Sequence, residues 1–143
     1  MPSQVHKTCD FLKACSKMGT DILVVDDEVD FAETFAERLR LRGFGVCVAY
    51  SGEQALRIVE QMAVGVMVLD LKMPGIDGLE VLRRVKKTHP EVEVIILSGH
   101  GSELDESYGR SLGAFEYLRK PADIADVVEA VKRAGKLRAG GAS

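Results

Sequence analysis

The sequence predicts an α/β fold in which helices cover both faces of a parallel sheet. Five short apolar runs, most of them rich in β-branched residues, recur along the 143-residue chain, and continuous runs of this kind are typical of strands buried on both faces. The segments between these runs place apolar side chains at helical spacing. Because parallel neighbours are joined by right-handed crossovers, this alternation predicts a doubly wound, three-layer sandwich.

Each predicted element has its own pattern. The predicted strands are the apolar runs at residues 22–25, 46–49, 66–69, 94–97 and 114–118. The predicted helices with a clear apolar stripe lie at residues 29–42, 52–61, 78–88 and 123–134. A weaker helix is predicted between the fourth and fifth strands, where serine and glycine lower the helix propensity and only Leu104, Tyr108 and Leu112 form a packing stripe. We expect this helix to be the most mobile element.

Turn and stop residues separate these elements. Glycine and proline interrupt helices and strands or allow the backbone to turn. They stand at the predicted boundaries, at Gly43, Gly65, Pro74, Gly75, Pro90, Gly113 and Pro121.

Composition and charge narrow the range of functions. With 143 residues, 46% hydrophobic and 29% charged, the chain has the size of one globular domain. Nineteen Lys and Arg against 22 Asp and Glu leave a formal charge of −3, so the chain lacks the positive field that nucleic-acid or anionic-membrane binding uses. The three cysteines include no CxxC pair, and no apolar run approaches the ~18 residues of a membrane span. We therefore expect a cytoplasmic protein without a membrane or direct nucleic-acid partner.

The two ends differ from the middle of the chain. Residues 1–19 are polar and unpatterned, whereas residues 136–143 have the composition of a flexible tail or the start of a linker. The predicted domain therefore covers residues 20–135, and it either stands alone or belongs to a longer protein. Because Met18 lies just before the first strand, we hypothesise that it is the natural start and that residues 1–17 have little structural role.

Charged and polar residues follow four of the five predicted strands. Ligands of open parallel sheets bind outside the carboxyl ends of the strands, so we expect these side chains to converge on one rim. They are Asp26, Asp27 and Glu28 after the first strand, Asp70 after the third, Ser98 after the fourth and Lys120 after the fifth.

Three aspartates on one rim call for a cation. Asp26, Asp27 and Asp70 would repel one another, which raises their pKa values unless a positive ion intervenes. Mg²⁺ suits the site, because it takes oxygen ligands, uses one or two carboxylates and leaves positions for a phosphate oxygen. Such a site favours phosphoryl transfer, with Asp70 as the attacking group, Lys120 neutralising charge and the Ser98 hydroxyl donating. A carboxylate nucleophile gives an acyl phosphate.

The order of these signals resembles the receiver domain of two-component response regulators. The resemblance rests on the acidic pair at 26–27, the DLKMPGIDG stretch at 70–78, the LSG stretch at 97–99 and the FEYLRKP stretch at 115–121, and it covers roughly residues 20–135. It implies a flavodoxin-like fold with five helices and a five-stranded parallel sheet in the order 2-1-3-4-5.

The resemblance also implies a role for each rim residue. Asp70 would accept a phosphoryl group from the phosphohistidine of a sensor histidine kinase or a phosphotransfer protein. Asp27, Asp70 and the backbone carbonyl of Lys72 would ligate Mg²⁺, with Asp26 acting through water. Lys120 would pair with Asp70 and later with a phosphoryl oxygen. The chain would then be a phosphorylated switch rather than an enzyme, catalysing only its own phosphotransfer and dephosphorylation.

A conformational switch is implied as well. The Ser98 hydroxyl would move to the phosphate and the Tyr117 ring would turn inward behind it. This would change a surface of the fourth helix, fifth strand and fifth helix that serves homodimerisation or target docking. Lys72 and His100 would face the phosphoryl group and tune its lifetime, and we hypothesise that Lys72 screens it from water. A cis peptide is expected before Pro121.

Two other interpretations stay open. A phosphotransferase or phosphatase of the haloacid-dehalogenase type would use a strand-one aspartate as nucleophile, but it needs a second aspartate where Glu28 stands. A receiver-like interaction module that is never phosphorylated would usually lack an acidic residue or the lysine. Taken singly, Asp26 or Asp27 is a common helix cap and Tyr117 a common packing residue, so the functional interpretation depends on their combination.

Overall fold

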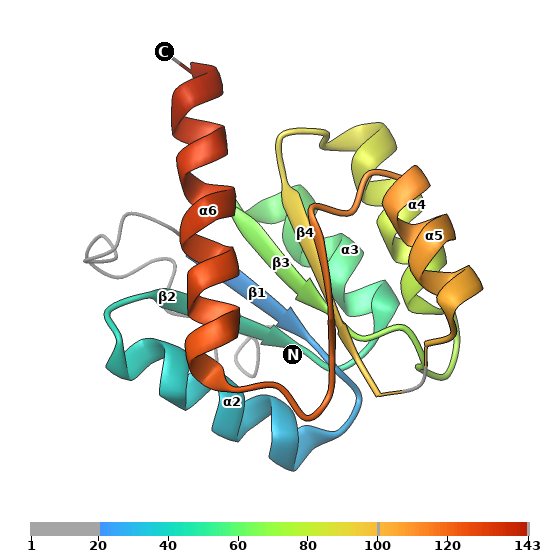
Figure 1. Ribbon diagram of the computed structural model, residues 1–143, viewed down its shortest axis with the longest axis horizontal. Coiled ribbons are helices and arrows are strands. Elements are labelled where there is room, and N and C mark those ends of the chain that lie inside the picture. Colours follow the sequence, from blue (N-terminus) through green and yellow to red (C-terminus); the bar gives the residue numbers. More distant parts are fainter. Residues whose placement is uncertain (1–20, 100, 143) are drawn as a thin grey trace.

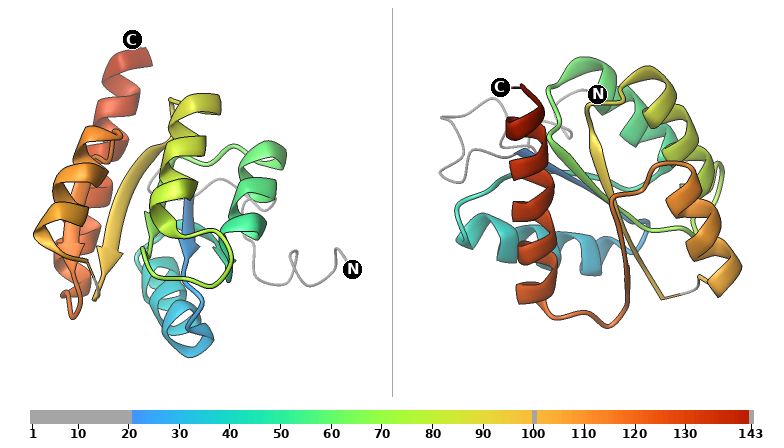
Figure 2. Two further views of the ribbon diagram at one scale, coloured as in Figure 1. Left: turned by 90° about the vertical axis from the view of Figure 1, so that its right-hand side faces the viewer. Right: turned by 45° about the horizontal axis from the view of Figure 1, so that its top comes forward.

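A five-stranded parallel sheet lies between two layers of helices (Figures 1 and 2). The structure is a computed structural model that describes residues 21–99 and 101–142, with side chains as far as residue 135. All strand pairs are parallel, and the strand order is 2-1-3-4-5. The predicted fold class is therefore confirmed. The strands are β1 (Asp21–Val25), β2 (Gly45–Ala49), β3 (Val66–Leu69), β4 (Glu93–Ser98) and β5 (Glu116–Arg119).

The sheet is buried on both faces. Along β1, Leu23 and Val25 pack into one hydrophobic cluster, whereas Ile22 and Val24 pack into the other. This division follows from the two-residue period of a strand, which sends alternate side chains to opposite faces. Because each face meets a layer of helices, both sets must be apolar, which accounts for the unbroken runs in the sequence.

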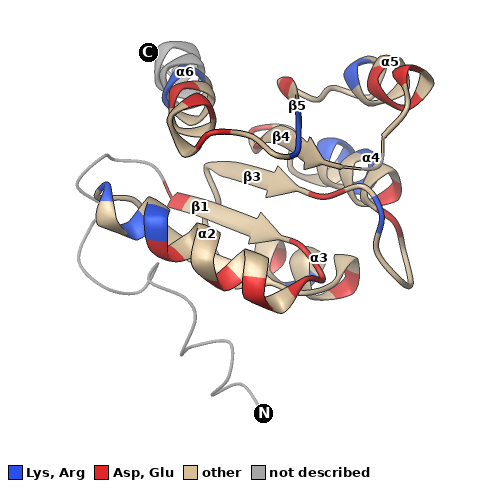
Figure 3. Cartoon of the chain, turned by 60° about the horizontal axis from the view of Figure 1, so that its bottom comes forward, with Lys and Arg blue, Asp and Glu red and all other residues tan. Residues whose placement is uncertain are grey.

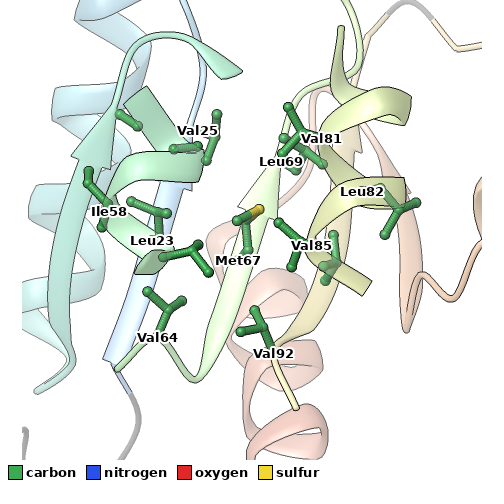
Figure 4. Packing of buried hydrophobic residues seen from close by; sticks show 14 of the residues in the cluster. Leu23, Val25, Ile58, Val64, Met67, Leu69, Val81, Leu82, Val85 and Val92 are labelled. Atoms are coloured by element: carbon green, nitrogen blue, oxygen red, sulfur yellow. The ribbon is translucent and has the colours of Figure 1, made fainter. Parts of the chain in front are cut away.

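The helices divide between the two faces. The helices are α2 (Val29–Leu41), α3 (Gly52–Gln61), α4 (Gly78–Thr88), α5 (Glu103–Ser111) and α6 (Ile124–Ala142). Helices α2 and α6 cover one face, and α3 and α4 cover the other, as the views in Figure 2 and the packing in Figure 4 show. Side-chain hydrogen bonds cap the N-termini of several helices and determine where these helices begin. Ser51 accepts from the amide of Gln54, and Asp77 accepts from the amide of Glu80.

Helix α6 is longer than predicted. Its backbone remains helical to Ala142, whereas the sequence predicted a helix ending at residue 134 and a flexible tail over 136–143. The helix therefore continues past its predicted end at residue 134, whereas the flexibility of residues 136–143 stays a prediction. Leu137 and Arg138 are good helix formers, and the glycines at 135, 140 and 141 lower the helix propensity without ending the helix.

The predicted packing stripe of α5 is wrong in part. Leu104 and Tyr108 are 82% and 53% exposed, so neither packs in the core. Gly109 makes the close contact instead, because a Cβ at that position would lie 2.8 Å from Ile96 Cδ1. A residue with no side chain lets the helix backbone approach the sheet, which propensity alone does not reveal.

The remaining predictions on the ends fall outside the described residues. The extension at 1–19, the start at Met18 and the side chains of the last residues belong to this group.

No helix in the described part of the chain combines the length and apolarity that crossing a bilayer requires. The peptide bond between Lys120 and Pro121 is cis, as expected.

Gly78 sets the distance between α4 and the end of β3. Its amide donates to the Leu71 carbonyl at 2.8 Å. A Cβ there would overlap the Asp70 carbonyl oxygen and lie 2.7 Å from Leu71 Cα. The obstacle is backbone, which cannot turn aside as a flexible side chain would.

We therefore expect Gly78→Ala to lower the free energy of unfolding by about 2 kcal/mol, the typical cost of overpacking. Urea unfolding followed by circular dichroism measures this. Gly99→Ala is the matched control, because its Cβ would meet Lys120 Cβ at an ordinary 3.6 Å and should change stability little. Equal unfolding midpoints for the two variants would contradict the steric argument.

His89 links the C-terminal ends of α3 and α4. Its Nε2 lies 3.0 Å from Glu60 Oε2 and its Nδ1 lies 3.6 Å from Glu91 Oε2. The Glu60 hydrogen bond, aided by the charges of both carboxylates, raises the pKa of the imidazole above its usual value. A raised folded-state pKa means that protonation stabilises the folded chain.

The stability difference between the wild type and His89→Gln should therefore depend on pH. It should be largest below about pH 6.5, the pKa of an unperturbed histidine, and should vanish as the pH rises through the higher folded-state pKa. Urea midpoints measured between about pH 5.5 and about pH 8.5 would test this. Glu60→Gln should remove most of the same dependence, and a difference that stays constant with pH would count against the pairing.

Candidate functional site

The carboxyl ends of β1 and β3 bring three aspartates together. The Asp26 amide donates to the Ala49 carbonyl at 3.1 Å, and the Asp70 amide donates to the Val25 carbonyl at 3.0 Å, so the sheet itself fixes both residues. Asp26 and Asp70 are 2% and 3% exposed, and Asp27 is more open. One carboxylate oxygen from each of the three lies within 4.8 Å of the others. Figure 3 shows acidic segments after β1 and β3 and a basic segment at the end of β5.

Asp70 is held close to other charges. Burial raises the pKa of its carboxyl, and the Asp26 charge raises it further. The Lys120 charge, a hydrogen bond from the Ser98 hydroxyl and one from the Leu71 backbone oppose this rise without cancelling it. The Oδ1 atom is buried and has no hydrogen-bond partner among the described residues. One oxygen of this carboxylate is therefore free to take a new partner.

Lys120 does not pair with Asp70 as the resemblance implied. Its Nζ donates to Asp26 Oδ2 at 2.7 Å and lies 3.4 Å from Glu28 Oε1. Burial acts to lower the pKa of the ammonium, but the hydrogen bond to Asp26 and the nearby carboxylates outweigh it and raise the pKa. Asp26 accepts the hydrogen bond from the ammonium, and the Lys120 charge acts on Asp70 through space.

The three aspartates fit a hard divalent cation. All their donor atoms are carboxylate oxygens, the kind of ligand that Mg²⁺ prefers. The buried Asp70 Oδ1 without a partner is the observation that favours an added ligand, since buried polar atoms are otherwise satisfied. The residues present therefore match the predicted Mg²⁺ site.

The two predicted switch residues lie beside this cluster. Ser98 ends β4, is buried and hydrogen-bonds to Asp70. The ring of Tyr117 is buried in the core on the α3 and α4 side of the sheet, and its hydroxyl has no hydrogen-bond partner among the described residues. Burial raises the pKa of this phenol. The hydroxyl occupies the space that a Cβ on Gly101 would need, so the ring already points inward.

The structure says less about Lys72 and His100, the two residues expected to tune the phosphoryl lifetime. Lys72 is exposed. Its charge helps a backbone hydrogen bond from Ser102 to lower the pKa of Asp105 at the start of α5. The Lys72 ammonium thus interacts electrostatically with the start of α5. His100 lies outside the described residues.

Four contacts at the rim were not predicted from the sequence. Glu28 reaches Lys120, and the Phe31 ring lies under the same ammonium, 4.1 Å from Nζ to the ring centroid. Arg119 donates to the Gly101 carbonyl at 2.8 Å and lies 3.4 Å from Glu106 in α5. Phe31 carried a weak signal, since it stands one helical turn after Asp27, but its spacing also suits a core position.

This arrangement can support phosphoryl transfer to a carboxylate. The Asp70 carboxylate has one oxygen without a partner among the described residues, the carboxylates of the cluster suit a divalent cation, and a partly buried ammonium and a hydroxyl lie within the same rim. These are the groups that stabilise the charge of a phosphoryl transition state.

Known proteins are similar to this chain in sequence and in fold. The family model described as the response regulator receiver domain matches residues 22–132. The regulatory protein VanRc of Enterococcus gallinarum is 39% identical over 115 residues, which cover 80% of this chain and 49% of VanRc. The chain thus spans about half the length of that relative.

Two solved structures show the same likeness. A receiver domain protein from Clostridium thermocellum is 36% identical with a TM-score of 0.79, and the match covers 83% of this chain and 96% of that one. A response regulator from Burkholderia pseudomallei, 27% identical with a TM-score of 0.75, is matched over 86% of this chain and 73% of its own. That structure contains a phosphorylated aspartic acid, a calcium ion and citrate. The family match spans most of the described sheet and all the aspartates of the rim, and the chain therefore belongs to the response regulator receiver domain family.

Proposed function

We propose that the chain is a phosphorylation switch that accepts a phosphoryl group on Asp70. The observation that carries this proposal is the cluster of Asp26, Asp27 and Asp70 oxygens within 4.8 Å of one another, in which the buried Asp70 Oδ1 has no hydrogen-bond partner among the described residues. The phosphorylated aspartate and calcium ion of the Burkholderia protein support the same assignment. The donor would be a sensor histidine kinase or a phosphotransfer protein.

Each residue of the rim has a defined part in this reaction. Asp26, Asp27, Asp70 and the Lys72 carbonyl would hold Mg²⁺, which when bound neutralises phosphate charge and orients it. An Asp70 oxygen forms a bond to phosphorus while the bond from phosphorus to the donor imidazole nitrogen breaks. The imidazole leaves with the electron pair and takes up a proton. The Lys120 ammonium and the Ser98 hydroxyl stabilise the oxygens of the transferred group.

The output is a change at the α5, β5 and α6 surface. An acyl phosphate adds about 1.5 to 2 negative charges at the rim, which attracts the Ser98 hydroxyl and the Lys120 ammonium. Tyr117 and Arg119 lie on β5 between the rim and α5, so they would pass this change to the exposed Leu104 and Tyr108. This surface would serve a homodimer or a separate target.

Two further assignments belong to the same proposal. Lys72 and His100 would set the phosphoryl lifetime, with Lys72 shared between the phosphoryl group and Asp105. The expected cytoplasmic location fits a protein that receives its phosphoryl group from a kinase in that compartment. Outside its own phosphotransfer and dephosphorylation, the domain would catalyse no reaction.

We expect acetyl phosphate and Mg²⁺ to add the mass of one phosphoryl group to the wild type and none to Asp70→Asn. Asparagine keeps the shape of the side chain but is a poor nucleophile, so the adduct should disappear. Intact mass spectrometry measures the adduct, and brief base treatment should remove it, as expected for an acyl phosphate.

Omission of Mg²⁺ with a chelator present is the control for the cation. A label that maps to Asp26 instead would favour the strand-one phosphotransferase. No adduct under any condition would favour an interaction module that is never phosphorylated.

Asp70→Asn should also stabilise the chain in the absence of Mg²⁺. Because the pKa of Asp70 is raised in the folded state, its ionisation at neutral pH costs folding free energy. Removing the charge should therefore raise the free energy of unfolding by about 1 kcal/mol, a size common for substitutions at strained functional sites. Urea unfolding at neutral pH measures the difference.

Added Mg²⁺ should then stabilise the wild type more than Asp70→Asn, because only the wild type keeps all three carboxylates. Asp77→Asn is the matched control. Asp77 lies outside the cluster and caps α4, a role that asparagine fills equally well, so both its stability and its Mg²⁺ response should stay near wild type. An unchanged or lower stability of Asp70→Asn would contradict the electrostatic interpretation.

A further inference from the structure

Lys120 is contacted by an aromatic ring as well as by carboxylates, and we propose that this ring, Phe31, is a positioning residue for the lysine. Its part is to keep the ammonium at the rim when a divalent cation competes for the carboxylates that otherwise hold it. This inference rests on the function proposed above and adds a residue to it.

The contact between the two side chains is close and well supported. Nζ of Lys120 lies 4.1 Å from the centroid of the Phe31 ring, well inside the ~6 Å over which an ammonium is attracted to an aromatic face. The Phe31 ring also stacks on Phe35, with centroids 5.5 Å apart and an interplanar angle of 11°. The second ring fixes the orientation of the first.

Lys120 needs such restraints because its side chain is long. Holding a lysine in one conformation costs more side-chain entropy than ordering most other side chains. Three groups restrain the ammonium, namely Asp26 at 2.7 Å, Glu28 at 3.4 Å and the Phe31 ring. The side chain is 16% exposed, whereas Glu28 is 67% exposed, so water screens the Glu28 contact. Asp26 is buried and Phe31 is half-buried, so both are better shielded from solvent than Glu28.

These two restraints respond differently to a divalent cation. Asp26 belongs to the aspartate cluster, so a cation bound there draws on the charge that attracts Lys120. Phe31 has no oxygen or nitrogen to offer a hard cation, and its attraction for the ammonium is unaffected. Phe31 is therefore the restraint that persists in the state in which Lys120 must meet the phosphoryl group.

Two other cation–aromatic contacts in the described residues do not hold a cationic side chain beside the aspartate cluster. Arg119 lies 5.4 Å from the Tyr117 ring and Arg133 lies 5.9 Å from the Phe115 ring. Both distances are longer, and neither arginine contacts the aspartate cluster. Phe115 packs against the same hydrophobic cluster as Phe31, which makes it a suitable comparison.

The test uses Phe31→Leu, which keeps an apolar side chain and removes the ring. In the metal-free wild type, the ring current should shift the Lys120 ε-methylene protons upfield in the NMR spectrum, and the shift should persist after Mg²⁺ is added. Phe31→Leu should abolish the shift. At saturating Mg²⁺ it should slow phosphorylation of Asp70 by acetyl phosphate about tenfold, as expected for loss of a desolvated cation–π contact, without changing Mg²⁺ affinity.

Two variants separate positioning from packing. Phe31→Tyr keeps the ring and should retain both the NMR shift and the rate. Phe115→Leu makes the same substitution at the opposite end of β5 and loses its own cation contact, and it should phosphorylate at the wild-type rate. If Phe31→Leu does not fold, the shift in the wild type and its persistence with Mg²⁺ still decide the proposal.

Several results would overturn it. One is phosphorylation of Phe31→Leu at the wild-type rate, and another is an equally slow phosphorylation of Phe115→Leu. A third is the absence of an upfield shift of the Lys120 ε-methylene protons in the wild type. A wild type that is never phosphorylated would instead refute the proposed function, and it leaves the NMR experiment as an independent measure of the Phe31 contact.

Discussion

Repulsion between buried carboxylates is the constraint on which the site depends. The hydrogen bonds of the sheet fix Asp26 and Asp70 at the ends of neighbouring strands, and the apolar layers on both faces prevent these strands from separating. The charges therefore cannot move apart. Burial raises the pKa of Asp70, and the fixed charge of Asp26 raises it further. The rigid core thus holds the ionised aspartates together at a cost in free energy, and a bound cation would lower that cost. A stable fold can in this way create a site that responds to cation binding.

The position of Lys120 shows how this cost is shared. Its ammonium hydrogen-bonds to Asp26 rather than to Asp70, so it offsets the charge of the cluster without covering the Asp70 carboxylate. A hydrogen bond from the lysine to Asp70 would have engaged an oxygen of the residue that we propose as the phosphoryl acceptor. The observed pairing leaves Asp70 Oδ1 without a hydrogen-bond partner among the described residues and keeps a positive charge beside the aspartate cluster.

Features that depend on the spacing of apolar residues could be predicted from the sequence. Features that depend on how closely a helix backbone approaches the sheet, or on side-chain conformation, could not. The run at 66–69 matches β3 residue for residue, because a strand buried on both faces needs a continuous apolar run. The position of α5 depends on Gly109 rather than on Leu104 or Tyr108. The aspartates, Ser98 and Lys120 were found from strand ends, but the partner of Lys120 depends on side-chain conformation, which no spacing encodes.

The end of β5 joins the two faces of the sheet. Alternate residues of a strand point to opposite faces, so Tyr117 and Arg119 lie on the α5 side, whereas Lys120 meets Phe31 of α2 on the other. A force on the Lys120 ammonium therefore acts on the same short segment that holds α5 through Arg119 and Glu106. Since α5 buries only one of its described residues, Gly109, little packing opposes its movement. Lys120, Arg119 and Glu106 thus connect the charged rim to the exposed surface of α5 through the end of β5.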